Sequence, residues 1–387
     1  MLHPVTLQPG AKSLNAALLA SSEPRVRRGD AACSMQNRPM TNLDGLTAIR
    51  FYAAFWVFVF HFNLRLPLHL PAPVMRIVEN GALAMPVFFM LSGLVLGYRY
   101  RHSYSGFSPF FRARVARIYP AYLLGVALSL PFLVSMPGFD VATAFFLVPV
   151  DLLLLQAWFP NLWHFWHHAG TWSISVEFFL YASFPLMLGL SRLPTRTLLA
   201  FCAACVLLAS SWIPSLGVGG SHDVPFPIFY SLPIYSLPTF AIGVALAELH
   251  QRGLRGSGWA IPAFALLLAV AGHHNIRYAG LNFIVLPLVG LSLLFAARYR
   301  GSALVNRAAV YLGDISYAFF VYQIPLLLAL EHWIVFARSF PVFLVGVAML
   351  GINLLFAALS HKWIEPWGRR LIVRRWMSSG PEMAVIA

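Results

Sequence analysis

Arg50 and His61 lie eleven residues apart in the first apolar run of the sequence, where an ionisable side chain needs a partner or a function. Eleven residues of an α-helix turn by about 1,100°, roughly 20° past three full turns, and rise by about 16 Å. Both side chains are therefore predicted to lie on one stripe of a helix. An imidazole suits proton transfer near neutral pH, so this stripe is a candidate for acid–base chemistry.

Two arginines and one carboxylate form the other candidate groups. Arg114 and Arg117 have i,i+3 spacing in a basic stretch that leads into an apolar run, and paired guanidinium groups suit a phosphate-bearing ligand. Glu177 falls one to two turns inside another apolar run, where a carboxylate requires a partner, a proton or a water-filled cavity. The structural alternatives are a snorkelling arginine, a histidine bonded into the core, arginines that anchor a loop, and a charge at the outer surface.

The composition predicts what kind of element positions these side chains. The chain has 387 residues, of which 59% are hydrophobic and 10% charged, and its mean hydropathy is +0.72. Soluble domains have about 45–50% apolar and about 25% charged residues, so a soluble enzyme, a disordered chain and a coiled coil are excluded. Long apolar runs such as 51–60 and 341–358 lack the alternation of a membrane barrel. The sequence predicts an all-α, polytopic integral membrane protein.

The apolar runs predict about ten transmembrane helices. Runs that reach or approach spanning length lie near 46–66, 81–98, 118–135, 172–190, 197–214, 229–249, 258–272, 279–297, 310–331 and 340–360. A further run at 141–158 contains Pro149 and Asp151, which are unfavourable in a lipid-facing helix. We expect residues of about 137–171, which include this run, to form a re-entrant or surface element on the outer side.

The basic residues predict the orientation of these helices. Lysine and arginine number 27 against 13 acidic residues, which gives a net charge of +14. When 141–158 is excluded as a span, 22 basic residues fall on one side, four on the other and Arg50 within the first helix. The positive-inside rule places the first side, with both termini, in the cytoplasm. The charge therefore indicates membrane topology rather than nucleic-acid binding.

A membrane domain and two polar tails make up the predicted domain organisation. Residues 1–41 predict a disordered cytoplasmic tail that is not a signal peptide, or a segment upstream of a true start at Met35 or Met40. Residues 42–370 form the membrane domain, and residues 371–387 form a cytoplasmic C-terminal tail.

Two histidines and two cysteines have spacings that could suit metal binding or redox chemistry, but their surroundings favour a structural role. His164 and His168 have the i,i+4 spacing of helical metal ligands, but no carboxylate accompanies them, and neighbouring tryptophans favour an interfacial aromatic belt. Cys202 and Cys205 lie in an apolar run and fit helix packing. We therefore expect no metal site.

Seven short motifs occur in order along the predicted membrane domain. They are Leu46…Arg50-x10-His61, Phe88-Phe89-Met90-Leu91-Ser92-Gly93, Arg114-x2-Arg117-Ile118-Tyr119-Pro120-Ala121-Tyr122, Trp172-Ser173-Ile174-Ser175-Val176-Glu177, Phe240-x2-Gly243, Leu312-Gly313-x-Ile315-Ser316-Tyr317-Ala318 and Ile364-Glu365-Pro366. Together they resemble the membrane acyltransferase-3 family of bacterial integral-membrane O-acyltransferases. The ten-helix core of that family matches the topology that the charges predict.

The resemblance implies an activity and a catalytic group. An acyl group, commonly acetyl from cytoplasmic acetyl-CoA, would be transferred to a hydroxyl of a glycan, a glycolipid or a glycosylated small molecule. His61 would be the catalytic histidine with Arg50 as its partner, and Glu177 would be the acidic residue of the tryptophan-serine motif. The histidine would act either as a base that activates the hydroxyl or as a transient acyl carrier.

The resemblance also implies a donor site and a location. Arg114 and Arg117, with Tyr122 of the same motif, would bind acetyl-CoA or another acyl-CoA. The protein would lie in the bacterial inner membrane, with membrane lipid and a carbohydrate or glycolipid acceptor as its partners. One position departs from the family pattern, because Gln323 stands where a histidine is common, and glutamine bonds but does not titrate.

Two other classes of function fit part of the pattern. A polytopic transporter or flippase could use the Arg50–His61 stripe as its pathway, although the two halves of the chain show no internal repeat. A sensor or assembly subunit could keep the fold without activity, and Gln323 is the residue that favours this interpretation.

Overall fold

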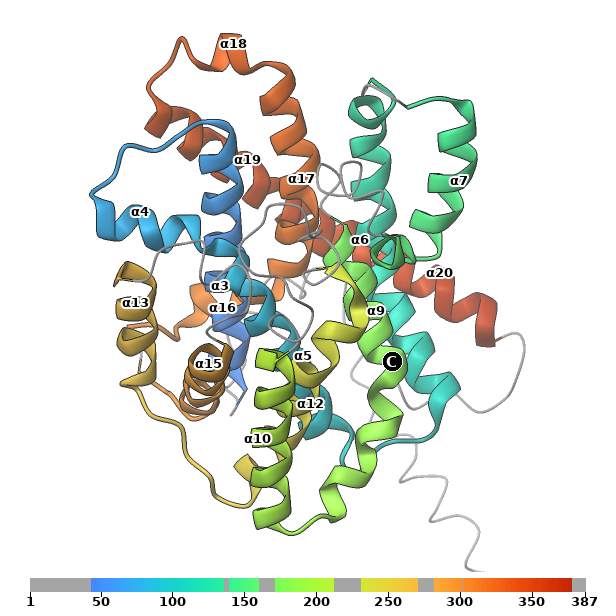
Figure 1. Ribbon diagram of the computed structural model, residues 1–387. Coiled ribbons are helices and arrows are strands. Elements are labelled where there is room, and N and C mark those ends of the chain that lie inside the picture. The colour runs from blue at the N-terminus through green and yellow to red at the C-terminus, as the bar shows by residue number, and fades with distance from the viewer. Residues whose placement is uncertain are drawn as a thin grey trace, which may run out of the picture. The chain divides into compact units, whose positions relative to one another are not determined.

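The computed structural model describes residues 43–135, 139–159, 171–211, 231–270, 282–301 and 303–377. Every element within these ranges is a helix, which confirms the all-α prediction (Figure 1). The predicted N-terminal tail, His164 and His168 lie outside the described residues, as do residues 378–387 of the predicted C-terminal tail.

Five stretches of the described chain are long and apolar enough to cross a membrane. They are α3 (Asp44–Arg65), η2 with α5 (Gly81–Leu83 and Ala84–Tyr100), α6 (Phe107–Leu133), α9 with η5 (Trp172–Ser183 and Phe184–Arg192), and α19 with η7 and α20 (Val342–Leu359, Ser360–Ile364 and Glu365–Met377). A sixth results if α16 (Arg307–Asp314) and α17 (Ser316–His332), which meet at a 60° bend, form one span. The chain is thus a multi-pass helical protein.

Four further helices coincide with the other predicted spans. These helices are α10 (Thr195–Ser211), α12 (Pro233–Gln251), α13 (Ala260–Val270) and α15 (Asn282–Ala296). Each predicted run coincides with a helix. Within the described residues, α10, α13 and α15 are shorter than a span, and α12, with 19 residues, is not among the five spans. The number of ten spans and the cytoplasmic position of both termini stay predictions.

The run at 141–158 forms α7 (Val141–Leu152), followed by the single turn η3 (Gln156–Trp158). Twelve residues of helix rise by about 18 Å, which is short of the roughly 30 Å of a bilayer core. Leu154 between the two elements has a φ of 56°, a left-handed conformation that is rare for leucine and ends the helix sharply. This geometry agrees with the expectation, based on Pro149 and Asp151, that the run does not span the membrane.

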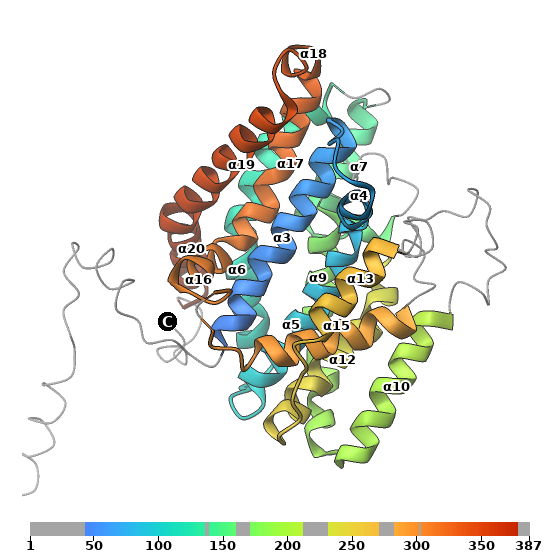
Figure 2. The ribbon, with the colours of Figure 1, turned by 90° about the vertical axis from the view of Figure 1, so that its left-hand side faces the viewer.

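Close packing of α5 against α12 forms the centre of the bundle, where the two helices lie side by side (Figure 2). A Cβ atom on Gly93 would lie 2.2 Å from the Phe240 carbonyl oxygen, and one on Gly243 would lie 2.0 Å from that of Met90. Only glycine permits such an approach, as at small-residue contacts between membrane helices. The packing gives a physical reason for the glycines of two sequence motifs.

The helix α3 packs along α16 and α17, and it runs antiparallel to the neighbouring α5 (Figures 1 and 2). At the start of α3, a Cβ atom on Gly313 of α16 would lie 2.0 Å from the Thr47 carbonyl oxygen. Farther along, Phe319 of α17 contacts Phe51 and Phe58 of α3, with ring centroids 5.6 and 5.7 Å apart. These contacts fix the register of α3 against the helices beside it.

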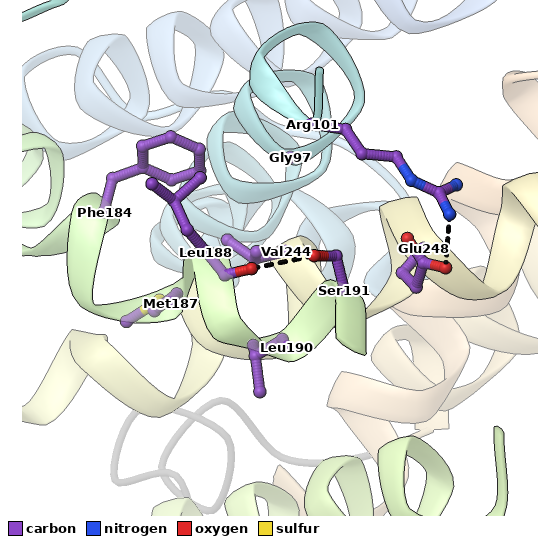
Figure 3. A pocket seen from close by; sticks show the side chains of 9 residues that line it. All are labelled: Gly97, Arg101, Phe184, Met187, Leu188, Leu190, Ser191, Val244 and Glu248. Atoms are coloured by element: carbon purple, nitrogen blue, oxygen red, sulfur yellow. Dashed lines mark hydrogen bonds and ion pairs between the residues drawn. The ribbon is translucent and has the colours of Figure 1, made fainter. Parts of the chain in front are cut away.

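A buried carboxylate joins three segments at the end of the bundle where α5 and α12 finish (Figure 3). Glu248 of α12 is 4% exposed and bonds Arg101 at 3.0 Å and Arg252 at 2.7 Å. Arg252 also donates to the Thr195 hydroxyl, at the start of α10, and to the Ser191 carbonyl. The hollow beside these groups has a volume of about 20 Å³, room for a single water molecule.

The substitution Glu248→Gln is expected to destabilise the fold by about 2 kcal/mol, because it leaves two partly buried arginines without their shared counter-charge. The measurement is the midpoint of thermal unfolding in detergent. The control is Arg255→Gln, which changes an exposed arginine on the following loop and should leave the midpoint unaltered. Equal midpoints for the two variants would contradict the role of Glu248.

Candidate functional site

Arg50 is half-buried in the part of α3 that faces three other helices. The groups close enough to act on its charge include Arg117 of α6, Glu177 of α9 and Asp314 at the end of α16. The contact between Gly313 and α3 explains the position of Asp314, because it places the end of α16 one turn from Arg50. The structure therefore brings together three residues that the sequence indicated separately, and it adds Asp314.

Glu177 accepts two hydrogen bonds at the same oxygen atom. The Ser92 hydroxyl on α5 donates to Glu177 Oε1 at 2.8 Å, and the Tyr181 hydroxyl donates to it from the next turn of α9. The carboxylate thus has the partners that a charge within an apolar helix requires. Sequence reasoning did not identify these partners as site residues. The i,i+4 spacing of Tyr181 was the available signal, whereas Ser92 approaches only through the packing of α5.

The substitution Ser92→Ala is expected to lower turnover about tenfold, because a hydrogen bond to a charged acceptor inside the protein is lost. The KM for the acyl donor that the resemblance implies should stay the same, since the Ser92 hydroxyl is bonded to Glu177. Steady-state kinetics of the purified protein measures both. The control is Ser129→Ala, which removes a buried hydroxyl that bonds the Gly125 carbonyl of its own helix. Wild-type turnover in Ser92→Ala would exclude the role of this serine.

Arg114 and Arg117 have different surroundings despite their i,i+3 spacing. Arg114 is 9% exposed, and its guanidinium lies 5.7 Å from the ring centroid of Tyr100 and 5.9 Å from those of Phe110 and Tyr181. Its Nη2 also donates to the Tyr100 hydroxyl at 3.2 Å. Such an aromatic enclosure holds a cation by cation–π attraction. Arg114 is therefore fixed in place by the protein itself.

Arg117 is half-buried one turn farther along α6 and lies within electrostatic range of Arg50. The Tyr317 hydroxyl of α17 donates to the Ile118 carbonyl at 2.9 Å, which fixes this turn of α6. Two guanidinium groups that repel each other form a favourable site for an anion, which neutralises both charges and accepts their hydrogen bonds. The pair Arg50 and Arg117 thus has the chemistry of a phosphate-binding site.

His61 lies in the same uninterrupted helix as Arg50, so the separation of about 16 Å predicted from their spacing applies. It is half-buried in the last turn of α3, and its ring centroid lies 5.2 Å from that of Phe60. The backbone carbonyl of His61 accepts a hydrogen bond from Arg65 at 3.2 Å. The histidine is therefore placed well away from the Arg50–Arg117 pair, toward the other end of the helix.

The position of Tyr122 differs from that of the two arginines with which the sequence grouped it. Its side chain is fully buried, and its hydroxyl donates to the Asp151 carbonyl at 2.6 Å and accepts from Gln156 Nε2 at 3.3 Å. These bonds hold the end of α7 and the turn η3 against α6. The hydroxyl of Tyr122 therefore has a structural use in this arrangement, and donor binding by Tyr122 stays a prediction.

Ser175, from one of the seven motifs, and Gln323, the position that departs from the family pattern, form hydrogen bonds to backbone groups rather than to charged side chains. Ser175 donates to the Leu154 carbonyl at 2.6 Å and accepts from the Ala157 backbone N–H at 3.3 Å, which stabilises the left-handed residue after α7. Gln323 is fully buried in α17 and donates to the Phe320 carbonyl of its own helix at 3.0 Å. Its position in the interior suits a hydrogen-bonding role.

An apolar groove of about 380 Å³ lies between η5, α10 and α12. Cys205 lines this groove, and both Cys202 and Cys205 are free thiols packed on α10, as the sequence predicts. The residues that line this groove and the hollow in Figure 3 do not include Arg50, His61 or Glu177. The candidate site is therefore defined by its charged and hydrogen-bonding groups.

Comparison with known proteins gives consistent matches over most of the chain. A family model described as an acyltransferase domain matches residues 43–361. The acyltransferase MdmB of Streptomyces mycarofaciens is 29% identical over 383 residues, which cover 89% of this chain and 96% of that protein. The O-acetyltransferase OatA of Staphylococcus aureus is 22% identical over 361 residues, which cover 84% of this chain and 56% of that protein. No solved structure gives a significant match.

Proposed function

Because the chain belongs to the membrane acyltransferase-3 family, we propose that it transfers an acyl group, in particular acetyl, from acyl-CoA to a hydroxyl of a glycan, a glycolipid or a glycosylated small molecule. The name O-acetyltransferase of one relative supports an acetyl group and an oxygen acceptor. The observation that carries the choice of donor is that Arg50 and Arg117 lie within electrostatic range of each other, because two such guanidinium groups suit the phosphates of CoA.

The proposed reaction places the donor along α3. Its phosphates bind at Arg50 and Arg117, and its thioester must then extend by about 16 Å to reach His61. A long and flexible donor such as CoA, which carries its thioester at the end of a pantetheine arm, meets this requirement. The arrangement also separates the site of phosphate binding from the site of acyl transfer.

His61 activates the acceptor in this mechanism. The imidazole takes the proton of the acceptor hydroxyl, and the oxygen attacks the thioester carbonyl carbon. The C–O bond forms, the C–S bond breaks, and the departing thiolate receives the proton from the imidazolium. If His61 instead carries the acyl group, an imidazole nitrogen attacks the thioester carbon, the C–S bond breaks, and the departing thiolate takes the imidazole proton. The acceptor oxygen then attacks the acyl carbon, the C–N bond breaks, and the hydroxyl proton passes to the imidazole. Glu177, which Ser92 and Tyr181 hold by hydrogen bonds, contributes a negative charge within electrostatic range of Arg50.

The test compares a deletion strain that carries the wild-type gene with one that carries an empty vector. Mass spectrometry of surface glycans, lipids and secreted glycosylated molecules should show an acyl group that is present only with the gene, and its mass identifies both acyl group and acceptor. Purified protein in lipid nanodiscs should then form this product from acyl-CoA and the acceptor. Transport of an unmodified acceptor, without product formation from acyl-CoA, would contradict the proposal and favour a transporter.

A further inference from the structure

The last turn of α3, which contains His61, is the part of this helix most exposed to fraying. The helix ends at Arg65, and Leu66 has an extended conformation. The Phe62 carbonyl, one residue beyond His61, still accepts the Leu66 backbone N–H at 2.9 Å, so the backbone ladder ends just after His61. Helix ends open more readily than helix centres. A catalytic group in this turn therefore needs support from outside the helix.

Arg65 supplies that support, because different nitrogen atoms of its guanidinium group contact the backbone of α3 and a carboxylate of α17. Its Nη1 donates to the His61 carbonyl at 3.2 Å, and its Nε lies 3.3 Å from Oε2 of Glu331 near the end of α17. The Arg65 side chain is 10% exposed, whereas that of Glu331 is 47% exposed. The half-exposed Glu331 of α17 thus pairs with the nearly buried guanidinium of Arg65, which in turn bonds the backbone carbonyl of His61.

Apolar packing reinforces this link. Phe62 and Leu66 from the end of α3 form a small buried cluster with Leu327 and Leu330 of α17. Helix α17 is packed along the rest of α3 through Phe319, so it forms a continuous support for α3. The two helices are therefore joined on both sides of the turn that carries His61.

We propose that Arg65, anchored by Glu331, is a positioning residue that holds the backbone of His61 in place for acyl transfer. The proposal rests on the catalytic role of His61 in the proposed function. A lysine cannot replace this arginine, because one ammonium group does not reproduce a hydrogen bond and an ion pair in the fixed directions of a guanidinium. The ion pair alone is half-exposed and contributes little stability, so its effect is on placement rather than on folding.

The experiment uses purified full-length Arg65→Gln, Arg65→Lys and Glu331→Gln with the acyl-CoA and acceptor identified as above. Each variant should lower kcat about five- to tenfold, with a donor KM that changes less than twofold. The double variant Arg65→Gln/Glu331→Gln should be no slower than Arg65→Gln, because both changes break one link. Hydrogen exchange of the His61–Arg65 amides should become faster in all of them.

The matched control is Arg76→Gln, which removes another arginine that donates to a single backbone carbonyl, that of Ala269 at 2.9 Å. It should keep wild-type kcat and wild-type exchange at His61. Wild-type kcat in Arg65→Gln, or an equal loss in Arg76→Gln, would overturn the positioning role. Full activity in His61→Ala would instead contradict the catalytic role of His61, so the two failures are distinguishable.

Discussion

His61→Ala is expected to abolish acylation of the acceptor, with a fall in rate of at least about 100-fold, while the protein still inserts and accumulates normally. The hydroxyl of a glycan is a poor nucleophile until a base removes its proton, and His61 is the titratable group that α3 places beyond the Arg50–Arg117 pair. Alanine leaves the helix intact. The measurement is product formation by mass spectrometry, with membrane abundance measured in parallel.

Two further variants sharpen this prediction. His61→Gln keeps a hydrogen-bonding side chain but cannot take a proton, so it should be as inactive as His61→Ala. His69→Ala is the control, because His69 is exposed on the segment after α3 and should be dispensable. Acylation at the wild-type rate in His61→Ala would remove His61 from the mechanism.

An experiment with the wild-type protein distinguishes the two possible roles of His61, as a base or as an acyl carrier. Incubation with acyl-CoA in the absence of acceptor, followed by mass spectrometry of peptides that contain His61, should reveal an added acyl group if the histidine is a carrier. An unmodified peptide, together with an inactive His61→Ala, assigns the histidine the role of a base.

Arg117→Ala is expected to raise the KM for acyl-CoA by about 10- to 100-fold, with a smaller effect on kcat. In the proposed donor site, removal of one of the two guanidinium groups takes away charged hydrogen bonds to a phosphate and leaves Arg50 to bind alone. Arg114→Ala should also weaken binding of acyl-CoA, because the i,i+3 residue belongs to the same motif. We expect a smaller effect there, since aromatic rings already hold Arg114.

Titration calorimetry with acyl-CoA measures these affinities directly, at two salt concentrations. Wild-type affinity should fall at high salt, and that of Arg117→Ala should fall less steeply, because one charge has been removed. Arg112→Ala is the matched control on the same helix and should bind as the wild type does. Unchanged affinity in both Arg114→Ala and Arg117→Ala would contradict donor binding and would mean that these arginines only set the membrane topology.

The chemistry of the membrane made the fold class predictable. A chain with so few charges and such long apolar runs must satisfy its backbone within itself, so an all-helical structure follows from composition. The acyltransferase-3 resemblance is likewise confirmed, because short motifs identify a family when they occur in order. The assignment of spans was harder, since hydropathy does not distinguish a helix that faces lipid from one packed inside the protein.

Helix α12 illustrates that limit. Its apolar sequence predicts a span, but most of its residues are buried among other helices, and Glu248 near its end is neutralised by arginines of two segments. An interior helix of this kind is apolar on all sides because protein surrounds it. Arg252 has the i,i+4 spacing that the sequence reveals, whereas the other partner of Glu248, Arg101, is distant along the chain and comes close only through packing.

The sequence by itself determined the relation between Arg50 and His61, because both lie on one helix and the geometry of a helix depends only on the number of residues between them. The tertiary structure decided which groups other helices supply: the Ser92 hydroxyl that bonds Glu177, the charges of Asp314 and Arg117 within electrostatic range of Arg50, and Glu331, which pairs with Arg65. These pairs depend on the register in which helices pack. That register is set by glycines such as Gly93 and Gly313 and by the shapes of neighbouring side chains, which local spacing does not reveal.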